Sequence, residues 1–234
     1  MIITAIGDIH GRSSWRTIVN RNPDSHFVFL ADYLDPYKRE KITEIEAIEN
    51  FEDIIDFKKS NPSNVTLLIG NHDAQYIFYP NFRTNGISSL FLLEINDIFT
   101  LNRNLFDFAY QRNDYLFVHA GISNAWFNRY RAVLDSFGLK SDLSNLGITL
   151  NKVGEDPRSK FCFSDISKFR GGFEPYGSPI WADDRELIYL SLTGTHQVVG
   201  HNKFDSIQRF GDDETSITFC DCLYKETKEL TLDI

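Results

Sequence analysis

The chain has 234 residues, 42% of them hydrophobic and 24% charged, a balance typical of globular proteins and unlike that of disordered or fibrous ones. Its formal net charge is −9 and it contains no block of Lys and Arg, which argues against duplex nucleic acid as a partner. No apolar stretch approaches the ~18 residues of a membrane span and the first residues carry no signal-peptide pattern, so we expect a protein that neither crosses a membrane nor is secreted.

The cysteines are few and odd in number: Cys162, Cys220 and Cys222. The spacing of Cys220 and Cys222 differs from the CxxC of redox and zinc motifs. A sparse, odd set favours a reducing compartment, and we predict a cytoplasmic location.

The first third of the chain alternates strand and helix patterns. Short apolar runs predict strands at residues 2–6, 26–31 and 64–69, and apolar residues at helical spacing predict helices at 13–21 and 41–60. This β-α-β-α-β order, with strands that are apolar throughout, indicates a parallel sheet covered by helices.

The rest of the chain is less regular. Residues 74–105 and 122–152 are expected to be mostly helical, and residues 108–121 predict a β-hairpin around the polar turn Arg112–Asp114. Short runs near the end of the chain resemble strands of an antiparallel sheet, at 196–201, 206–210, 216–220 and 229–234. We predict an α/β protein in which residues 1–234 form one domain with two sheets packed together.

Polar residues follow the predicted strands. They are Asp8 and His10 after the first strand, Asp32 and Asp35 after the second, Asn71, His72 and Asp73 after the third, His119 after the hairpin and His201 after the first late strand. In open α/β sheets ligands bind beyond the carboxyl ends of the strands, so this repeated placement predicts a site there.

Each signal taken alone has an ordinary explanation, because Asp is a common turn residue and a single His at a strand end is usually structural. His26 has no partner motif and is interpreted as structural. Together, however, the residues offer carboxylate, imidazole and amide ligands without a cysteine, a set that suits Mn²⁺, Fe or Zn²⁺ and is too rich in nitrogen for Ca²⁺. The ligands exceed the need of one ion, which favours a pair of metals that share a carboxylate.

The ordered motifs GDIHG, GNHD, VHAG and VVGH, spread between residues 7 and 201, resemble those of the calcineurin-like metallophosphoesterases. The similarity is greatest to the branch of Ser/Thr protein phosphatases and the bacterial and phage protein phosphatases. The resemblance implies a four-layer α-β-β-α sandwich with two central mixed sheets.

The resemblance also implies roles for individual residues. A hydroxide bridging two metals would attack the phosphorus, His72 would protonate the leaving alkoxide, and Asp35 would hold and polarise His72. The implied metal ligands are Asp8, His10, Asp32, Asn71, His119 and His201, with Asp32 bridging the two ions. His196 is an alternative to His201, and we favour His201 because it follows its strand whereas His196 begins it.

The stretch Ala31–Tyr37 departs from the family pattern. The family has an arginine that grips the substrate phosphate where this chain has Pro36, which offers neither charge nor an N–H. Proline should also bias Asp35 toward extended backbone. Replacement cations, each alternatively a solvated surface charge, are Arg83, Arg170, Arg185, Lys38 and Arg39, and of these we favour Arg170 and Arg185.

The first functional hypothesis is therefore a phosphomonoesterase that uses two divalent transition metals, Mn²⁺ before Fe or Zn²⁺, on a phosphoprotein or a small phosphoester. Alternatives are a dinucleoside polyphosphate hydrolase and a hydrolase of RNA-end 2′,3′-cyclic phosphate. A non-catalytic metal-binding scaffold is a third alternative, disfavoured because His72 and Asp35 are both present.

Overall fold

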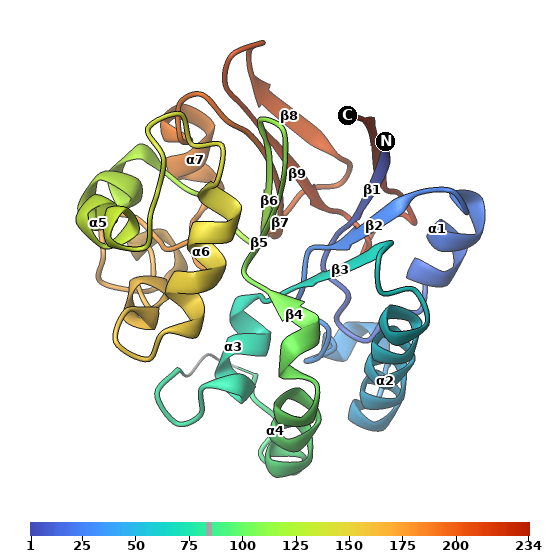
Figure 1. Cartoon of the computed structure of the whole chain (residues 1–234). Coiled ribbons are helices and arrows are strands. Elements are labelled where there is room, and N and C mark those ends of the chain that lie inside the picture. The colour runs from blue at the N-terminus through green and yellow to red at the C-terminus, as the bar shows by residue number, and fades with distance from the viewer. Residues whose placement is uncertain (83–85) are drawn as a thin grey trace.

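The computed structural model describes residues 1–82 and 86–234. The candidate Arg83 lies outside the described residues. Figure 1 shows two β-sheets side by side between two groups of helices, which confirms the predicted α-β-β-α arrangement.

The first sheet has the strand order β10-β1-β2-β3-β4. Strands β1 to β4 are parallel neighbours, and β10 from the end of the chain pairs antiparallel with β1. The strands are β1 Ile2–Ile6, β2 His26–Phe29, β3 Val65–Leu68, β4 Phe106–Asp107 and β10 Leu230–Asp233. The three parallel strands that the sequence predicted are confirmed, whereas β4 was not predicted and lies between the expected helical segment and the expected hairpin.

The second sheet has the strand order β5-β6-β7-β9-β8. The hairpin β5–β6 is confirmed, and its strand β6 pairs parallel with β7, which in turn pairs parallel with β9. The strands are β5 Ala109–Arg112, β6 Tyr115–Val118, β7 His196–Lys203, β8 Gln208–Gly211 and β9 Ser216–Asp221. The late strands were expected to resemble an antiparallel sheet, which holds for β8 and β9. It does not hold for β7, which pairs parallel with β6 and β9, and β10 joins the first sheet instead.

The helices cover the outer faces of the two sheets. In Figure 1, α1, α2 and α4 lie on the side of the first sheet, and α5, α6 and α7 lie on the side of the second. Their bounds are α1 Trp15–Arg21, α2 Glu44–Ser60, α3 Asn71–Ile77, α4 Leu92–Leu101, α5 Asn124–Ser136, α6 Leu146–Glu155 and α7 Asp184–Leu190. Short 3-10 turns occupy Lys38–Glu40, Arg103–Leu105, Lys160–Phe163 and Lys168–Arg170. No helix in the described ranges is long and apolar enough to cross a membrane.

Helix α2 shows how local sequence fixes these elements. Thr43 caps its first turn in a reciprocal box: the Thr43 hydroxyl accepts from the Glu46 N–H at 3.2 Å, and the Glu46 carboxylate accepts from the Thr43 N–H at 2.8 Å. Lys58 and Lys59 lie in the last turn, where the helix dipole favours positive charge.

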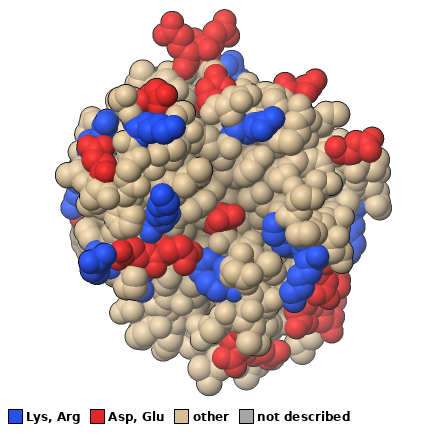
Figure 2. Space-filling model, viewed as in Figure 1, with Lys and Arg blue, Asp and Glu red and all other residues tan. Residues whose placement is uncertain are grey.

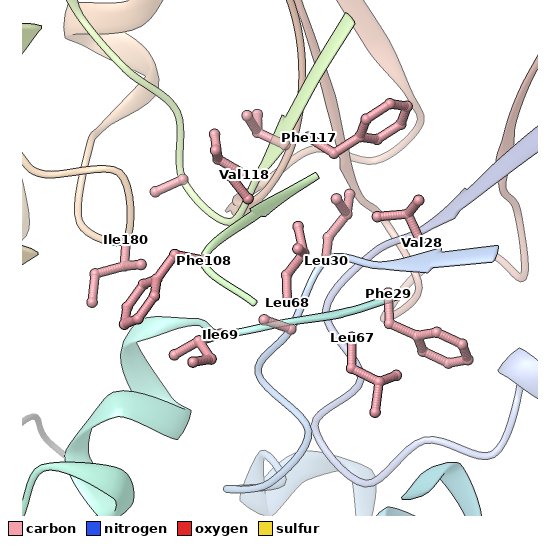
Figure 3. Packing of buried hydrophobic residues seen from close by; sticks show 14 of the residues in the cluster. Val28, Phe29, Leu30, Leu67, Leu68, Ile69, Phe108, Phe117, Val118 and Ile180 are labelled. Atoms are coloured by element: carbon pink, nitrogen blue, oxygen red, sulfur yellow. The ribbon is translucent and has the colours of Figure 1, made fainter. Parts of the chain in front are cut away.

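The core alternates along the parallel strands, as a pleated backbone requires. Figure 3 shows Val28 and Leu30 directed toward Val118 of the second sheet, while Phe29 points the other way. Phe29 meets Trp15 of α1 at a ring separation of 5.8 Å. Each fully buried side chain of this kind stabilises the fold by about 1.5–3 kcal/mol. Packing on both faces thus fixes β2, and with it the segment that follows it.

Candidate active site

The register of the strands brings their carboxyl ends to one place. Ile6 of β1 is paired with Phe29 of β2, and Phe29 with Leu67 of β3, so the three strands end level. In the second sheet Phe117 is paired with Val198, and the N–H of Gly200 donates to the carbonyl of His119 at 2.8 Å. The polar residues that follow these strands therefore converge between the two sheets.

Two groups of ligand atoms share Asp32. The first contains Asp8, His10 and Asp32, with His10 Nε2 3.9 Å from Asp8 Oδ2 and 3.8 Å from Asp32 Oδ2. The second contains Asp32, His119 and His201, with His119 Nε2 3.4 Å from Asp32 Oδ2 and 3.2 Å from His201 Nδ1. All five side chains are buried.

Asn71 completes the second group. It is the first residue of α3, and its Oδ1 lies 2.9 Å from His119 Nε2. Every residue that the sequence nominated as a metal ligand is therefore brought into one cluster. Whether each binds a metal stays a prediction.

The histidines are oriented as metal-binding histidines usually are, with one ring nitrogen held by the protein. His10 Nδ1 lies 2.9 Å from the carbonyl of Leu34, and His119 Nδ1 lies 2.7 Å from the carbonyl of Leu30. A carbonyl only accepts, so Nδ1 carries the proton in the neutral ring and Nε2 keeps its lone pair. His201 Nε2 is buried and has no hydrogen-bond partner among the described residues.

The electrostatics of the cluster also fit bound cations. Burial lowers the pKa of His10 to about 3 and that of His201 well below its usual value, which keeps both rings neutral. Burial opposes the charge on His119 too, yet Asp32 raises its pKa to about 10. The Asp32 carboxylate thus stabilises a positive charge beside it, and a metal ion can supply that charge. The donor set, the unpartnered His201 Nε2 and the negative charge of Asp32 all fit a metal centre.

Two glycines let the backbone approach the cluster. A Cβ on Gly70 would lie 2.1 Å from Asp32 Oδ1, and a Cβ on Gly200 would lie 2.1 Å from Asp8 Oδ1. Real side chains cannot make such contacts, so only glycine leaves room for both carboxylates.

The backbone at the site is unusual as well. His10, Asp32, Asp35 and His201 all have positive φ angles, of 43°, 50°, 58° and 61°. Non-glycine residues in this region cost roughly 1–3 kcal/mol each and persist where the surroundings hold them. The expectation that proline would make Asp35 extended was wrong, because hydrogen bonds to its side chain hold it in place.

Those hydrogen bonds connect Asp35 to His72 and to helix α3. His72 Nδ1 lies 2.7 Å from Asp35 Oδ2, Gln75 Nε2 donates to the same oxygen at 2.5 Å, and the Tyr76 hydroxyl donates to Asp35 Oδ1 at 2.5 Å. Burial opposes charge on His72, but Asp32 and Asp35 together raise its pKa to about 9. The metal-free site therefore holds His72 protonated, as a general acid must be.

Asp73 has a structural role that the sequence did not predict. Its carboxylate accepts from the backbone N–H groups of Gly70, Asp32 and Tyr33, at 2.9, 2.9 and 3.1 Å. It thereby ties the turn after β2 to the start of α3. The GNHD motif contained this residue, but nothing in the motif distinguishes a turn clamp from a ligand.

The structure separates the two candidate histidines of β7. His201 lies in the cluster, inside β7 at a register irregularity rather than after the strand. His196 begins β7 and contacts Ser216 at 2.8 Å and Asp114 at 3.5 Å, away from the ligands.

A cavity of about 300 Å³ opens beside the cluster and includes Asp8, Asp32, Asn71, His72 and His201 in its wall. Figure 2 shows acidic atoms near the middle of one face of the molecule, with Lys and Arg side chains around them. The remaining wall residues are Tyr37, Arg170, Trp181 and Lys203. Tyr37 and Lys203 were missed by sequence reasoning, although residues 201 and 203 are two apart on a strand and alternation places such residues on one face.

The candidate cations are placed differently from one another. Arg170 lines the cavity, 27% exposed, with its Nε 3.0 Å from Asp183 and its guanidinium on Asn202. Arg185 is 57% exposed, pairs with Asp183 at 2.7 Å and does not line the cavity, so its nomination for substrate phosphate gains no support. Lys38 and Arg39 also lie outside the cavity wall.

Comparison with known proteins agrees with this site. The family model of the calcineurin-like phosphoesterases matches residues 1–201, which is most of the chain. The chain therefore belongs to that family, and it is a hydrolase of the metal-dependent phosphoesterase class.

Solved structures share its fold. The cold-active protein-tyrosine phosphatase of a psychrophilic Shewanella species superposes with a TM-score of 0.58 at 17% identity, covering 99% of this chain and 75% of that one. Another structure of a cold-active protein tyrosine phosphatase gives a TM-score of 0.60 at 18% identity, covering 99% and 73%. At these identities the likeness speaks for the fold alone.

Proposed function

We propose that this chain is a phosphomonoesterase that uses two divalent metal ions and acts on a phosphorylated protein or a small phosphoester. The observation that carries the proposal is the pair of ligand groups sharing Asp32 beside the His72–Asp35 pair. A shared carboxylate suits two ions, and an adjacent acid suits departure of an alkoxide.

The residues divide between the two ions through Asp32. Asp8 and His10 would complete one site, and Asn71, His119 and His201 the other. When bound, such a pair lowers the pKa of water to provide a nucleophile near neutral pH and offsets the charge of the phosphoryl group. We propose Mn²⁺, with Fe or Zn²⁺ as alternatives, because the donors are mixed oxygen and nitrogen atoms without thiolate.

His72 would supply the proton that the leaving group needs. Nδ1 is engaged by Asp35, which leaves the Nε2 proton to be transferred to the departing ester oxygen. Gln75 and Tyr76 hold Asp35 through both of its oxygens, so the imidazole keeps one orientation. No covalent intermediate on the protein is required.

Arg170 is proposed to contact the substrate phosphate in place of the arginine that Pro36 replaces. Its guanidinium lines the cavity, and its Nη1 has no hydrogen bond within the described residues. Arginine remains charged at all relevant pH and matches phosphate geometry.

We also propose that residues 1–234 act as one domain, because the two metal sites draw ligands from both sheets. The three cysteines are free and buried, which supports a reducing, cytoplasmic setting.

The test is a substrate panel on protein loaded with Mn²⁺. The panel contains p-nitrophenyl phosphate, its bis-ester, Ser/Thr and Tyr phosphopeptides, diadenosine tetraphosphate and a 2′,3′-cyclic nucleotide, with metal analysis alongside. We expect about two metals per chain and turnover of the monoesters above the others. Preference for diadenosine tetraphosphate or the cyclic nucleotide would replace the monoesterase proposal, and a protein that cannot be loaded with metal would end it.

A further inference from the structure

The cavity contains a second cation with fewer partners than Arg170. Lys203 ends β7, and its Nζ lies 3.5 Å from the centre of the Tyr37 ring. Both residues belong to the cavity wall beside Asp32 and His72. Tyr37 directly follows Pro36 in the sequence. The aromatic ring that contacts the Lys203 ammonium therefore belongs to the segment in which the family's arginine is missing.

The contacts of Lys203 leave its ammonium available to a ligand. Among residues 1–82 and 86–234 its ammonium has no ion-pair or hydrogen-bond partner, and its specific contact is the face of the Tyr37 ring. Arg170, by contrast, is already engaged with Asp183, Asn202 and the carbonyl of His201. An ammonium on an aromatic face is held in position while its three N–H donors stay free to bind an anion.

Tyr37 itself is fixed from the other side. Its ring packs against the ring of His10, with the ring centres 4.5 Å apart. Its hydroxyl lies 3.0 Å from His10 Nε2, the atom assigned to a metal, so in the loaded protein the ring contact is what holds Tyr37. Arg12, beneath, is clamped to Glu40 by two hydrogen bonds at 2.7 and 2.8 Å. The platform under Lys203 is therefore built from the same residues that shape the metal cluster.

Two acidic residues, Asp221 and Asp8, lie near Lys203. Asp221 lies opposite Lys203 in the β7–β9 ladder, is buried, and neither of its carboxylate oxygens has a hydrogen-bond partner among the described residues. Asp8 lies on the cavity wall beyond it. Partial burial opposes the charge of Lys203, and these two acids attract the ammonium against that effect.

We propose that Lys203, seated on the ring of Tyr37, is a second phosphate-binding residue, which acts beside Arg170 to make up for the arginine absent at position 36. This inference rests on the proposed phosphoesterase function and names the group that receives its substrate. A lysine binds phosphate as a point charge rather than as a bidentate fork, so it fits a terminal phosphoryl group presented in several orientations.

The test measures binding of inorganic phosphate to protein loaded with Mn²⁺ by titration calorimetry, which does not depend on turnover. Lys203→Met keeps the aliphatic stem and removes the charge. It should weaken phosphate binding and raise KM for p-nitrophenyl phosphate by about tenfold, the size of one charge-assisted contact, with the metal content unchanged.

Two further variants make the result specific. Lys203→Arg keeps the charge and should stay within about threefold of the original protein. Lys38→Met removes the same charge from the neighbouring segment outside the cavity wall and should change phosphate affinity less than twofold. Equal effects of Lys203→Met and Lys38→Met, or no effect of Lys203→Met, would overturn the inference.

The two proposals can fail separately. If the original protein hydrolyses monoesters and Lys203→Met binds phosphate normally, the inference fails and the proposed function stands. If the original protein binds phosphate through Lys203 but hydrolyses none of the panel, the proposed function fails and the assignment of Lys203 stands.

Discussion

The two sides of the cavity are built differently. The ligand side consists of the buried cluster residues, which follow strands or, for His201, lie inside β7, each oriented by a backbone carbonyl, a backbone N–H or another ligand. The cation side adjoins it and consists of Tyr37, Arg170 and Lys203, which come from a loop, a 3-10 turn and the last residue of a strand.

This difference explains how one side can keep a family pattern while the other departs from it. Moving a ligand would disturb β-strand packing, the close approaches at Gly70 and Gly200, and the strained backbone at Asp32 together. Exchanging a cation on the other side disturbs little, because Lys203 contacts the protein mainly through the Tyr37 ring. The residues proposed for the chemistry are thus tied to the core, and those proposed to bind substrate are not.

The largest effect is expected from Asp32→Asn, which keeps the shape and removes the charge shared by both ligand groups. Metal content should fall, and kcat/KM should drop by about 10³-fold or more, because both ligand groups lose the negative charge of the carboxylate they share. Metal analysis and turnover of p-nitrophenyl phosphate check this. Asp114→Asn, in the β5–β6 turn next to His196 at the start of β7, is the control and should leave both within threefold. Full metal content and activity in Asp32→Asn would contradict the shared-ligand assignment.

The next largest effect is expected from changing His72, the proposed general acid. His72→Asn should lower kcat/KM for an alkyl phosphate by about 10²–10⁴-fold, and considerably less for p-nitrophenyl phosphate, whose leaving group needs no proton. Steady-state kinetics on both esters measure the difference. Equal losses on the two esters would rule out proton transfer by His72.

A matched histidine variant tests whether His201 rather than His196 is a metal ligand. His196→Asn removes an imidazole from the other end of β7, where it contacts Ser216. Metal content and activity should remain within threefold of the original protein. A loss of metal would instead return His196 to the ligand set.

A smaller effect is expected from Tyr76→Phe, which removes the hydrogen bond to Asp35 Oδ1 and keeps the ring. Because Tyr76 acts through Asp35 and His72, kcat/KM for alkyl phosphates should fall about tenfold. The loss on p-nitrophenyl phosphate should be smaller, which distinguishes a positioning residue from a purely structural one. An equal loss on both esters would indicate that the hydroxyl serves stability alone.

The smallest effect tests the recognition side. Arg185→Ala should change kcat/KM less than twofold, since Arg185 is exposed and outside the cavity wall, whereas Arg170→Ala should lower it about tenfold or more. The same kinetic assay on both variants makes the comparison. The reverse order would mean that the two arginines exchange places when substrate binds.

Much of the ligand side could be predicted from the sequence. Asp8, Asp32 and Asn71 follow apolar runs whose length and composition define strands, and level parallel strands bring their ends together wherever the rest of the chain lies. The partnership of Asp35 with His72 was implied by motif order, and the 2.7 Å contact agrees with it.

The tertiary structure alone decided the rest. Nothing in the local pattern separates Arg170 from Arg185, because both are arginines of the same irregular stretch before and at α7. For His201 and His196 the position relative to the predicted strand favoured His201, and the structure places His201 in the cluster, although inside β7. Which of them faces the cavity depends on the path of the loop before α7 and on the irregularity in β7, and both are set by packing between distant segments. Lys203 on Tyr37 joins residues 166 positions apart, so it exists only in the folded chain. The sequence by itself determined which residues could form the proposed metal site, because they lie at or near strand ends. The fold decided which residues could bind phosphate, because those residues meet only through long-range contacts.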